Sequence, residues 1–396
     1  MAAADVVIVG SGPAGCGAAA RLLAEGRRVT MLEAGPGPER PAAVTSLDAL
    51  AAAATPGWTW PGVHWRRAGA DRGPYAIGRG VGGGSAVNAM VLTVGDPAMH
   101  DAWAARTGDD GWAWAAFDDA YQRILAQLPA TTLEAGPLGQ AVALAAERTA
   151  GSGVTPGGAR GTGGGRPSTL AVGATGVLAA TVAADAGQRL PLVDVVCAAD
   201  GGGRHPHLDV QCNRQVRRVM AGVDGAVVGV ETDDGDRVTA PAVVLAAGAL
   251  HSPALAETGR PPRWVGPVAG EGPRPVMDHP SFAFTVALRP EARVDPSPLP
   301  PVSIVVRCGP QGGLDGPTSV LVHVLDHVGP GEEGRRHGAV VVALAEPSSV
   351  GTVEPGPDGA MLIEPAWLDD GTVATALLPG AHVIEHVHQD RGRAVE

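Results

Sequence analysis

Residues 78–90 of the chain read GRGVGGGSAVNAM. The consecutive glycines Gly82, Gly83 and Gly84 offer backbone without Cβ atoms, so their amide groups can lie against a flat ring or a phosphate. Ser85 can add a hydroxyl donor, and Asn88 either positions the reactive edge of a bound ring or stabilises the turn. The stretch therefore predicts a loop that holds a nucleotide-like cofactor.

A second glycine-rich turn lies near the N-terminus, where residues 5–15 read DVVIVGSGPAG. Its β-branched run predicts a strand, and the segment that continues to Glu25 predicts a helix whose N-terminus faces phosphates. Gly10 permits the turn, Gly12 lets the backbone approach a pyrophosphate, and Gly15 lets the helix pack closely on the strand. We expect Gly12→Val to remove cofactor binding and Gly15→Ala to be milder. The candidate residues of this turn are Gly10, Ser11, Gly12, Ala14 and Gly15.

An acidic residue follows the next apolar run. Residues 28–32 read RVTML, and Glu33 comes 18 residues after Gly15, about where an acid accepts a ribose hydroxyl. An acid at this place disfavours a 2′-phosphate, so the pattern argues against NADP. Glu33 and its neighbour Ala34 are therefore candidate cofactor contacts.

The glycine loop and several later segments resemble the glucose–methanol–choline oxidoreductases, a family of FAD-dependent alcohol oxidases and dehydrogenases. The resemblance runs in the family's order from about residue 5 to about residue 370. The matching segments are residues 78–91 with Gly95-Asp96-Pro97, Gly111-Trp112 with Tyr121, Arg166-Pro167-Ser168, 207–219, 243–253 and Met277-Asp278-His279-Pro280.

This resemblance implies FAD as the cofactor. It implies further contacts from the loop at 78–90, from a strand whose valine touches adenine, and from a turn beneath the pyrophosphate. Family members with covalently attached flavin carry a histidine before the loop's asparagine, and Val87 at that place implies noncovalent FAD. The residues that the resemblance adds to the site are Arg79, Ala89, Val216, Ala247 and Gly248.

The C-terminal part departs from the family's pattern. Residues 345–353 and 363–368 resemble segments just upstream of the family's catalytic histidine or asparagine, but the segment that follows in the family is not found. No catalytic residue is therefore assigned. Because a missing base slows proton abstraction, we expect the chain as given to bind FAD and to oxidise alcohols poorly.

Composition restricts the partners. The net charge of −12 and the pI near 5.4 argue against nucleic acid or an anionic membrane surface. All 29 basic residues are arginine, which excludes a Walker-type lysine and a Schiff base. No apolar run is long enough for a membrane span and the N-terminus does not read as a secretory signal, so we expect a cytoplasmic protein.

No pattern favours a metal site. The four cysteines lack CxxC spacing and fit reduced thiols. A His-rich tail would place several ligands on one face if it were helical, but we favour a solvated polar tail. The residues concerned are Cys16, Cys197, Cys212 and Cys308, and His382, Glu385, His386, His388 and Asp390 of the tail.

Aromatic residues precede the glycine loop. Trp58, Trp60 and Trp65 either wall a cofactor or substrate channel or pack a loop onto the core, and we favour packing. For His279, in the Asp-His-Pro turn, we expect a structural hydrogen bond rather than proton transfer.

We predict an α/β fold: a Rossmann-like FAD-binding domain with a β-meander, plus a substrate domain built on an antiparallel sheet. Asp224-Gly225 and Asp234-Gly235 mark the hairpin turns of the meander, and 282–288, 302–306, 320–324 and 340–344 read as strands of the second sheet. The expected ranges are 1–280 for the FAD-binding domain, with a linker at 151–165 and the meander at 207–240, 281–370 for the substrate domain, and 371–396 for a tail.

The favoured function is oxidation of an alcohol CH–OH group, with hydride transfer to FAD and then to an electron acceptor that the sequence does not identify. A catalytically incomplete FAD-binding protein, degenerate or completed by a partner chain, is one alternative. An NAD-dependent dehydrogenase is another, which fits Glu33 but leaves residues 78–88 unexplained. The compact, arginine-only chain is also compatible with the family's short actinobacterial members associated with mycofactocin.

Overall fold

The structure is a computed structural model. It describes residues 4–37, 39–66, 72–149, 176–182, 184–185, 187–190, 192–199, 203–258, 274–294, 302–308, 320–329, 331–345, 347, 349–355 and 361–366. The expected linker, the Arg-Pro-Ser segment at 166–168 and the tail at 371–396 lie outside these residues. The described helices include none that is long and apolar enough to cross a bilayer.

The chain forms two compact units. Unit 1 comprises residues 1–88, 189–276 and 351–365, and unit 2 comprises 89–188, 277–350 and 366–396. This division differs from the contiguous ranges expected from the sequence, because the chain passes from one unit to the other several times.

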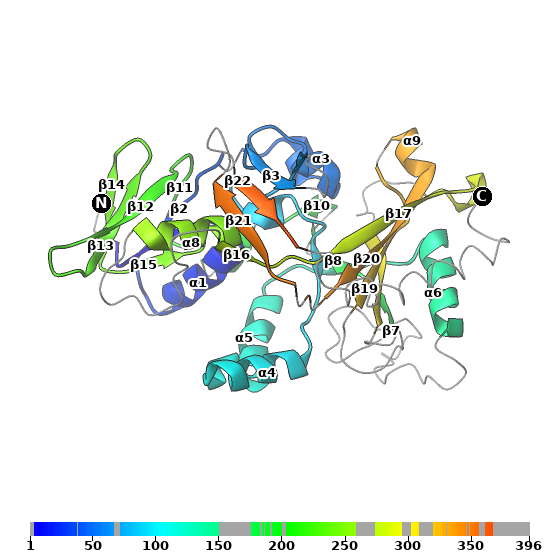
Figure 1. Cartoon of the computed structure of the whole chain (residues 1–396), viewed down its shortest axis with the longest axis horizontal. Helices are drawn as coiled ribbons and strands as arrows, with labels where there is room; N and C mark the ends of the chain where they lie inside the picture. Colours follow the sequence, from blue (N-terminus) through cyan, green and yellow to red (C-terminus); the bar gives the residue numbers. More distant parts are fainter. Residues whose placement is uncertain are drawn as a thin grey trace. The chain divides into compact units, whose positions relative to one another are not determined.

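Unit 1 is built on a parallel sheet of order β11-β2-β1-β15. β1 (Val6–Val9) and β2 (Val29–Leu32) are buried along their whole length, as their apolar, largely β-branched sequences predict. α1 (Pro13–Ala24) connects them and packs on the sheet (Figure 1), while β15 (Val243–Leu245) pairs with the other edge of β1. The predicted strand, turn, helix and second strand are confirmed.

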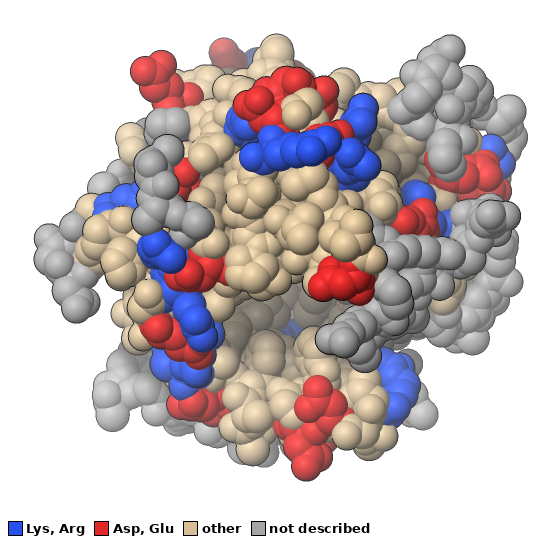
Figure 2. Space-filling model, turned by 90° about the vertical axis from the view of Figure 1, so that its left-hand side faces the viewer, with Lys and Arg blue, Asp and Glu red and all other residues tan. Residues whose placement is uncertain are grey.

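The predicted meander is formed by β12 (Val216–Ala221), β13 (Val227–Thr232) and β14 (Arg237–Thr239). Gly225 and Gly235 take positive φ at its two turns, as the Asp-Gly pairs predict. The expectation that the meander begins near residue 207 is wrong, since β11 (Leu208–Gln211) pairs with β2 in the parallel sheet. Figure 2 faces this end of the molecule and shows arginine and acidic side chains intermingled rather than segregated by sign.

A further sheet of unit 1 has the order β16-β21-β22-β3-β4. It joins β3 (Val63–Arg66) and β4 (Arg72–Pro74) to distant segments, β16 (Arg274–Val276), β21 (Gly351–Pro355) and β22 (Met361–Glu364). The remaining elements of unit 1 are α2 (Ala42–Thr45), α3 (Ala49–Ala53), η1 (Gly83–Ala86), α7 (Leu192–Val196) and α8 (Gly248–Thr258).

Unit 2 contains the predicted antiparallel sheet. All four expected strands are present, as β17 (Ser281–Ala287), β18 (Val302–Cys308), β19 (Val320–Leu325) and β20 (His337–Leu344), and β7 (Gly176–Ala179) adds an unpredicted fifth. The sheet has the order β17-β20-β19-β18-β7. α6 (Pro137–Thr149) covers one face, where Leu138 and Val142 pack among alternate valines of β19 and β20. In the Asp-His-Pro turn, His279 Nδ1 lies 2.8 Å from the Leu344 carbonyl oxygen, which is the structural hydrogen bond expected there.

Short elements complete unit 2 and the passage to unit 1. They are β5 (Val91–Leu92), α4 (Pro97–Thr107), η2 (Asp110–Trp112), α5 (Trp114–Leu125), β6 (Thr131–Thr132), β8 (Thr181–Val182), β9 (Ala184–Asp185), β10 (Gln188–Arg189), η3 (Pro290–Ala292) and α9 (Glu332–Arg335).

A buried carboxylate fixes the start of α6. Asp326 accepts hydrogen bonds from Gly136 N at 3.0 Å, from Gly139 N at 2.9 Å and from the Ser303 hydroxyl. Asp326→Ala leaves these donors buried without an acceptor, so we expect the free energy of unfolding to fall by about 3 kcal/mol. Urea denaturation tests this. Asp119→Ala, at an exposed position of α5, should change the stability by less than about 1 kcal/mol, and equal effects of the two substitutions would contradict the assignment.

Candidate cofactor site

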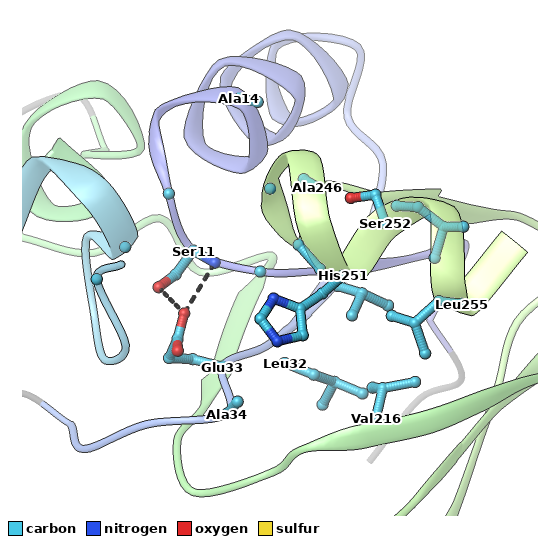
Figure 3. Close-up of a pocket in the computed structure, with 18 of the residues that line it drawn as sticks. Ser11, Ala14, Leu32, Glu33, Ala34, Val216, Ala246, His251, Ser252 and Leu255 are labelled. Carbon is cyan, nitrogen blue, oxygen red and sulfur yellow. Dashed lines mark hydrogen bonds between the residues drawn. The ribbon is translucent and has the colours of Figure 1, made fainter. Parts of the chain in front are cut away.

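A cavity of about 520 Å³ lies in unit 1 at the carboxyl ends of the parallel strands. It is enclosed by the first glycine turn, the ends of β2 and β15, the flavin loop (defined as residues 78–88), the start of β12 and the first turns of α8 (Figure 3). Open α/β sheets bind ligands at this edge. The sequence-predicted residues that line the cavity are Gly10, Ser11, Gly12, Ala14, Glu33, Ala34, Gly83, Gly84, Val216, Ala247 and Gly248.

The glycines of the first turn have separate tasks. A Cβ at Gly15 would lie 2.1 Å from the carbonyl oxygen of Gly10, so helix and strand approach more closely than any other residue allows. A Cβ at Gly12 would meet no atom nearer than Gly83 Cα at 3.9 Å, and it would point between the turn and the flavin loop. The close helix–strand approach expected at Gly15 agrees with this distance, and the role of Gly12 stays a prediction. Gly15→Ala, which we expected to be the milder substitution, places a Cβ against backbone and is a threat to folding rather than to the cofactor.

Glu33 ties the two glycine-rich segments together. Its Oε2 accepts hydrogen bonds from Ser11 N at 3.1 Å and Ser11 Oγ at 2.5 Å, and its Oε1 accepts from Gly35 N and Gly80 N, each at 3.0 Å. Ser11 Oγ in turn accepts from Gly82 N at 3.2 Å. Glu33 is 5% exposed, and these four bonds hold its two carboxylate oxygens in place. Glu33 thus assembles the site before any ribose hydroxyl reaches it.

Glu33→Gln should therefore weaken the protein even without cofactor. The amide NH₂ would face an N–H donor in place of an accepting oxygen, and we expect the free energy of unfolding of the cofactor-free protein to fall by about 2 kcal/mol. Chemical denaturation measures this. Glu25→Gln, at an exposed end of α1, is the matched control and should stay within about 0.5 kcal/mol. An unchanged stability of Glu33→Gln would leave Glu33 with ribose binding alone.

A buried arginine holds the end of the flavin loop. Arg189 Nη1 donates to the carbonyl oxygens of Asn88 at 2.6 Å and Ser85 at 3.0 Å, and it lies 3.3 Å from Asn88 Oδ1. Burial lowers the pKa of Arg189 to about 10, so the guanidinium stays charged at neutral pH. Arg189 was not predicted, because it lies in a two-residue strand about a hundred residues from the loop and belongs to no recognised motif.

The other candidates lie around the cavity rather than on its wall. The Ser85 hydroxyl donates to Gly82 O at 2.7 Å inside the loop, and Arg79 stands over the Trp60 ring, with Cζ 5.4 Å from its centroid. Gly15, Gly82 and Asn88 are not among the lining residues, and Ala89 belongs to unit 2. Trp58 is buried against Val44 and Ala86, which is the packing role expected from the sequence. Trp60 instead lines the cavity.

Several wall residues were not predicted. Most of them come from the end of β15, from α8 and from the segment before Val216. In that segment, Arg214 Nη1 pairs with Asp234 and Asp236 at 2.8 Å each. Residues of α8 could have been predicted to line the cavity, because α8 follows the carboxyl end of β15 and ligands bind at that edge of such sheets. The additional lining residues are Val9, Pro13, Leu32, Trp60, Ile77, Gly78, Arg214, Gln215, Leu245, Ala246, His251, Ser252, Ala254 and Leu255. In the part of the chain that the structure describes, no three His, Cys, Asp or Glu side chains could hold a metal ion, and the C-terminal histidines lie outside it.

The site is that of a dinucleotide-binding protein of the flavoprotein type. It combines a βαβ unit, an acid after the second strand and a second glycine loop on the same cavity. The family model of the GMC oxidoreductases matches residues 4–259, and the chain belongs to this family. Its cofactor is FAD, the cofactor of GMC oxidoreductases. The site fits that group, because N–H groups at the start of α1 and a Cβ-free gap at Gly12 face the cavity.

Individual relatives share part of the sequence. Pyridoxine 4-oxidase of Microbacterium luteolum is 36% identical over 122 residues, 29% of this chain and 23% of that protein. Dehydrogenase pkfF of Emericella nidulans is 33% identical over 138 residues, 32% of this chain and 23% of that protein. These alignments therefore span less than a quarter of either relative.

Solved structures show the same architecture at low identity. The crystal structure of pyridoxine 4-oxidase from Mesorbium loti matches 99% of this chain and 83% of its own, with a TM-score of 0.80 at 22% identity. A formate oxidase matches 99% of this chain and 82% of its own, with a TM-score of 0.74 at 18% identity. The predicted fold class, a Rossmann-like FAD-binding part with an antiparallel-sheet part, is confirmed.

Proposed function

We propose that the chain acts in the oxidation of a small-molecule alcohol at its CH–OH group, with noncovalently held FAD. The observation that carries the proposal is the cavity on which the first glycine turn, Glu33 and the flavin loop converge in a GMC oxidoreductase. When bound, FAD supplies a hydride acceptor. The NAD-dependent alternative has no comparable support, because the family's cofactor is FAD.

The chain's own residues would bind and orient the cofactor. We assign the pyrophosphate to the turn at 10–15 and the start of α1, where N–H groups converge without a side chain at Gly12. The adenosine end lies toward Glu33 and Val216, and the backbone of Gly83 and Gly84 faces the cavity from the flavin loop. Ala247 and Gly248 close the wall after β15. Val87, before Asn88, offers no nucleophile for a covalent flavin bond.

We further propose that the antiparallel sheet of unit 2 belongs to the substrate domain. Support comes from the order of the chain, in which this sheet follows the FAD-binding segments, and from the resemblance described above. The four free cysteines favour a reducing compartment such as the cytoplasm. No residue is assigned as the catalytic base.

Absorption spectroscopy tests the function. Purified protein should show a flavin spectrum, and acid precipitation should release all of the flavin into the supernatant. Colour that stays with the denatured protein would contradict noncovalent binding, and a chain unable to take up FAD would overturn the proposal.

Substrate is tested by anaerobic mixing with an alcohol panel that includes pyridoxine and aryl alcohols, because pyridoxine oxidases are among the relatives. Bleaching of the flavin band identifies an alcohol substrate, and recolouring on admission of air distinguishes an oxidase from a dehydrogenase. Bound flavin that no alcohol bleaches would favour the alternative of an FAD-binding protein that is catalytically incomplete.

A further inference from the structure

Apolar side chains gather at one end of the cavity. Glu33 stands at its edge, while Leu32, Val216 and Leu255 supply aliphatic walls. His251 of α8 also lines this end, and Figure 3 shows its imidazole reaching into the cavity between Glu33 and Leu255. An aromatic ring among aliphatic side chains offers a planar ligand a stacking surface.

The imidazole is held in place by a tryptophan. Trp60 and His251 stack with ring centroids 4.2 Å apart and an interplanar angle of 28°. Trp60 is itself fixed, since its backbone N–H donates to Ile77 O at 2.9 Å and Arg79 stands near its ring. The His251 ring is therefore preorganised, and ordering it costs little when a ligand arrives.

The charge state of His251 suits stacking. Burial lowers the pKa of His251, so the ring is neutral at neutral pH and its stacking on a ligand needs no buried counter-ion. Among the described residues its ring nitrogens make no hydrogen bond. They remain available to a ligand's polar edge.

We propose that the adenine ring of the cofactor stacks on His251, which Trp60 supports from behind. The inference rests on the proposed FAD function and deepens it. Glu33 marks the end of the cavity where a ribose is recognised, and the base joined to that ribose must lie on the walls beside it. Those walls are His251, Val216 and the aliphatic residues named above.

Binding of FAD and of ADP to cofactor-free protein tests the proposal, because both ligands carry adenine and ADP lacks the flavin. Calorimetry should show that His251→Ala weakens both ligands by about tenfold, the loss typical of removing one stacking side chain. His251→Phe should bind both ligands within about threefold of wild type, since it keeps a planar ring. His207→Ala, at an exposed position outside the cavity, should bind both normally.

His251→Leu separates stacking from simple packing. It keeps apolar volume without a planar ring, so its affinities should follow His251→Ala rather than His251→Phe, and melting curves of the cofactor-free variants show that each is folded. Unchanged FAD and ADP affinity in His251→Ala would overturn the proposal, as would a loss confined to FAD or equal affinities for the Leu and Phe variants. Failure of the wild-type protein to bind FAD would instead overturn the proposed function.

Discussion

Gly15→Ala should prevent stable folding of unit 1. The added Cβ would come 2.1 Å from the carbonyl oxygen and 3.2 Å from the carbonyl carbon of Gly10, and this backbone cannot yield without separating α1 from β1. We expect a loss of at least about 4 kcal/mol in the free energy of unfolding, a large share of a domain's stability. Soluble yield, circular dichroism and thermal melting measure the effect.

Gly17→Ala is the matched control for that experiment. Gly17 lies in the same helix, and a Cβ there would meet no atom within 4 Å. Alanine should raise helix stability by up to about 1 kcal/mol. A Gly15→Ala protein that melts with the wild type would show that α1 can move away from β1 at little cost.

The sequence predicted those parts of the fold in which segments that follow one another along the chain also pair in the sheet. The run at 5–9, the turn at 10–15 and the acid at Glu33 determine a βαβ unit on their own. The sequence did not predict which strands pair when they lie far apart along the chain. β11 reads as the first strand of a hairpin ladder, yet it pairs with β2, and β7 joins β18 across more than a hundred residues. Short apolar runs do not specify their neighbours in a sheet.

The same distinction holds for the candidate site. Glycine motifs encode backbone geometry, so Gly10, Gly12 and Gly83 could be placed from the sequence alone. The fold brings the side chains of Arg189 and His251 to the site from distant parts of the sequence. The residues next to them form no pattern that predicts a place in the site. The sequence also could not decide whether Trp60 packs a loop onto the core or lines a cavity. The structure decides it, because α8 places His251 against the Trp60 ring.

Gly12→Val should abolish FAD binding while the cofactor-free protein stays folded. Gly12 has φ −69° and ψ 179°, which any residue adopts, and its Cβ would meet only Gly83 Cα at 3.9 Å and Gly82 O at 4.0 Å. Valine therefore fits the folded chain, apart from about 1 kcal/mol lost because it caps a helix poorly. Its methyl groups would occupy the gap between the turn and the flavin loop where we place the pyrophosphate. Titration with FAD should show an affinity lower by at least about 100-fold.

Gly12 and Gly15 are required for different reasons. At Gly15 protein backbone fills the space that a Cβ would need, whereas at Gly12 that space must stay open for a ligand. Gly17→Val places the same side chain inside α1, five residues beyond Gly12, and should bind FAD normally. If Gly12→Val bound FAD as tightly as the wild type, the pyrophosphate would have to lie elsewhere on the cavity wall. The N–H groups at the start of α1 would then have no ligand, and the assignment of the whole turn would be wrong.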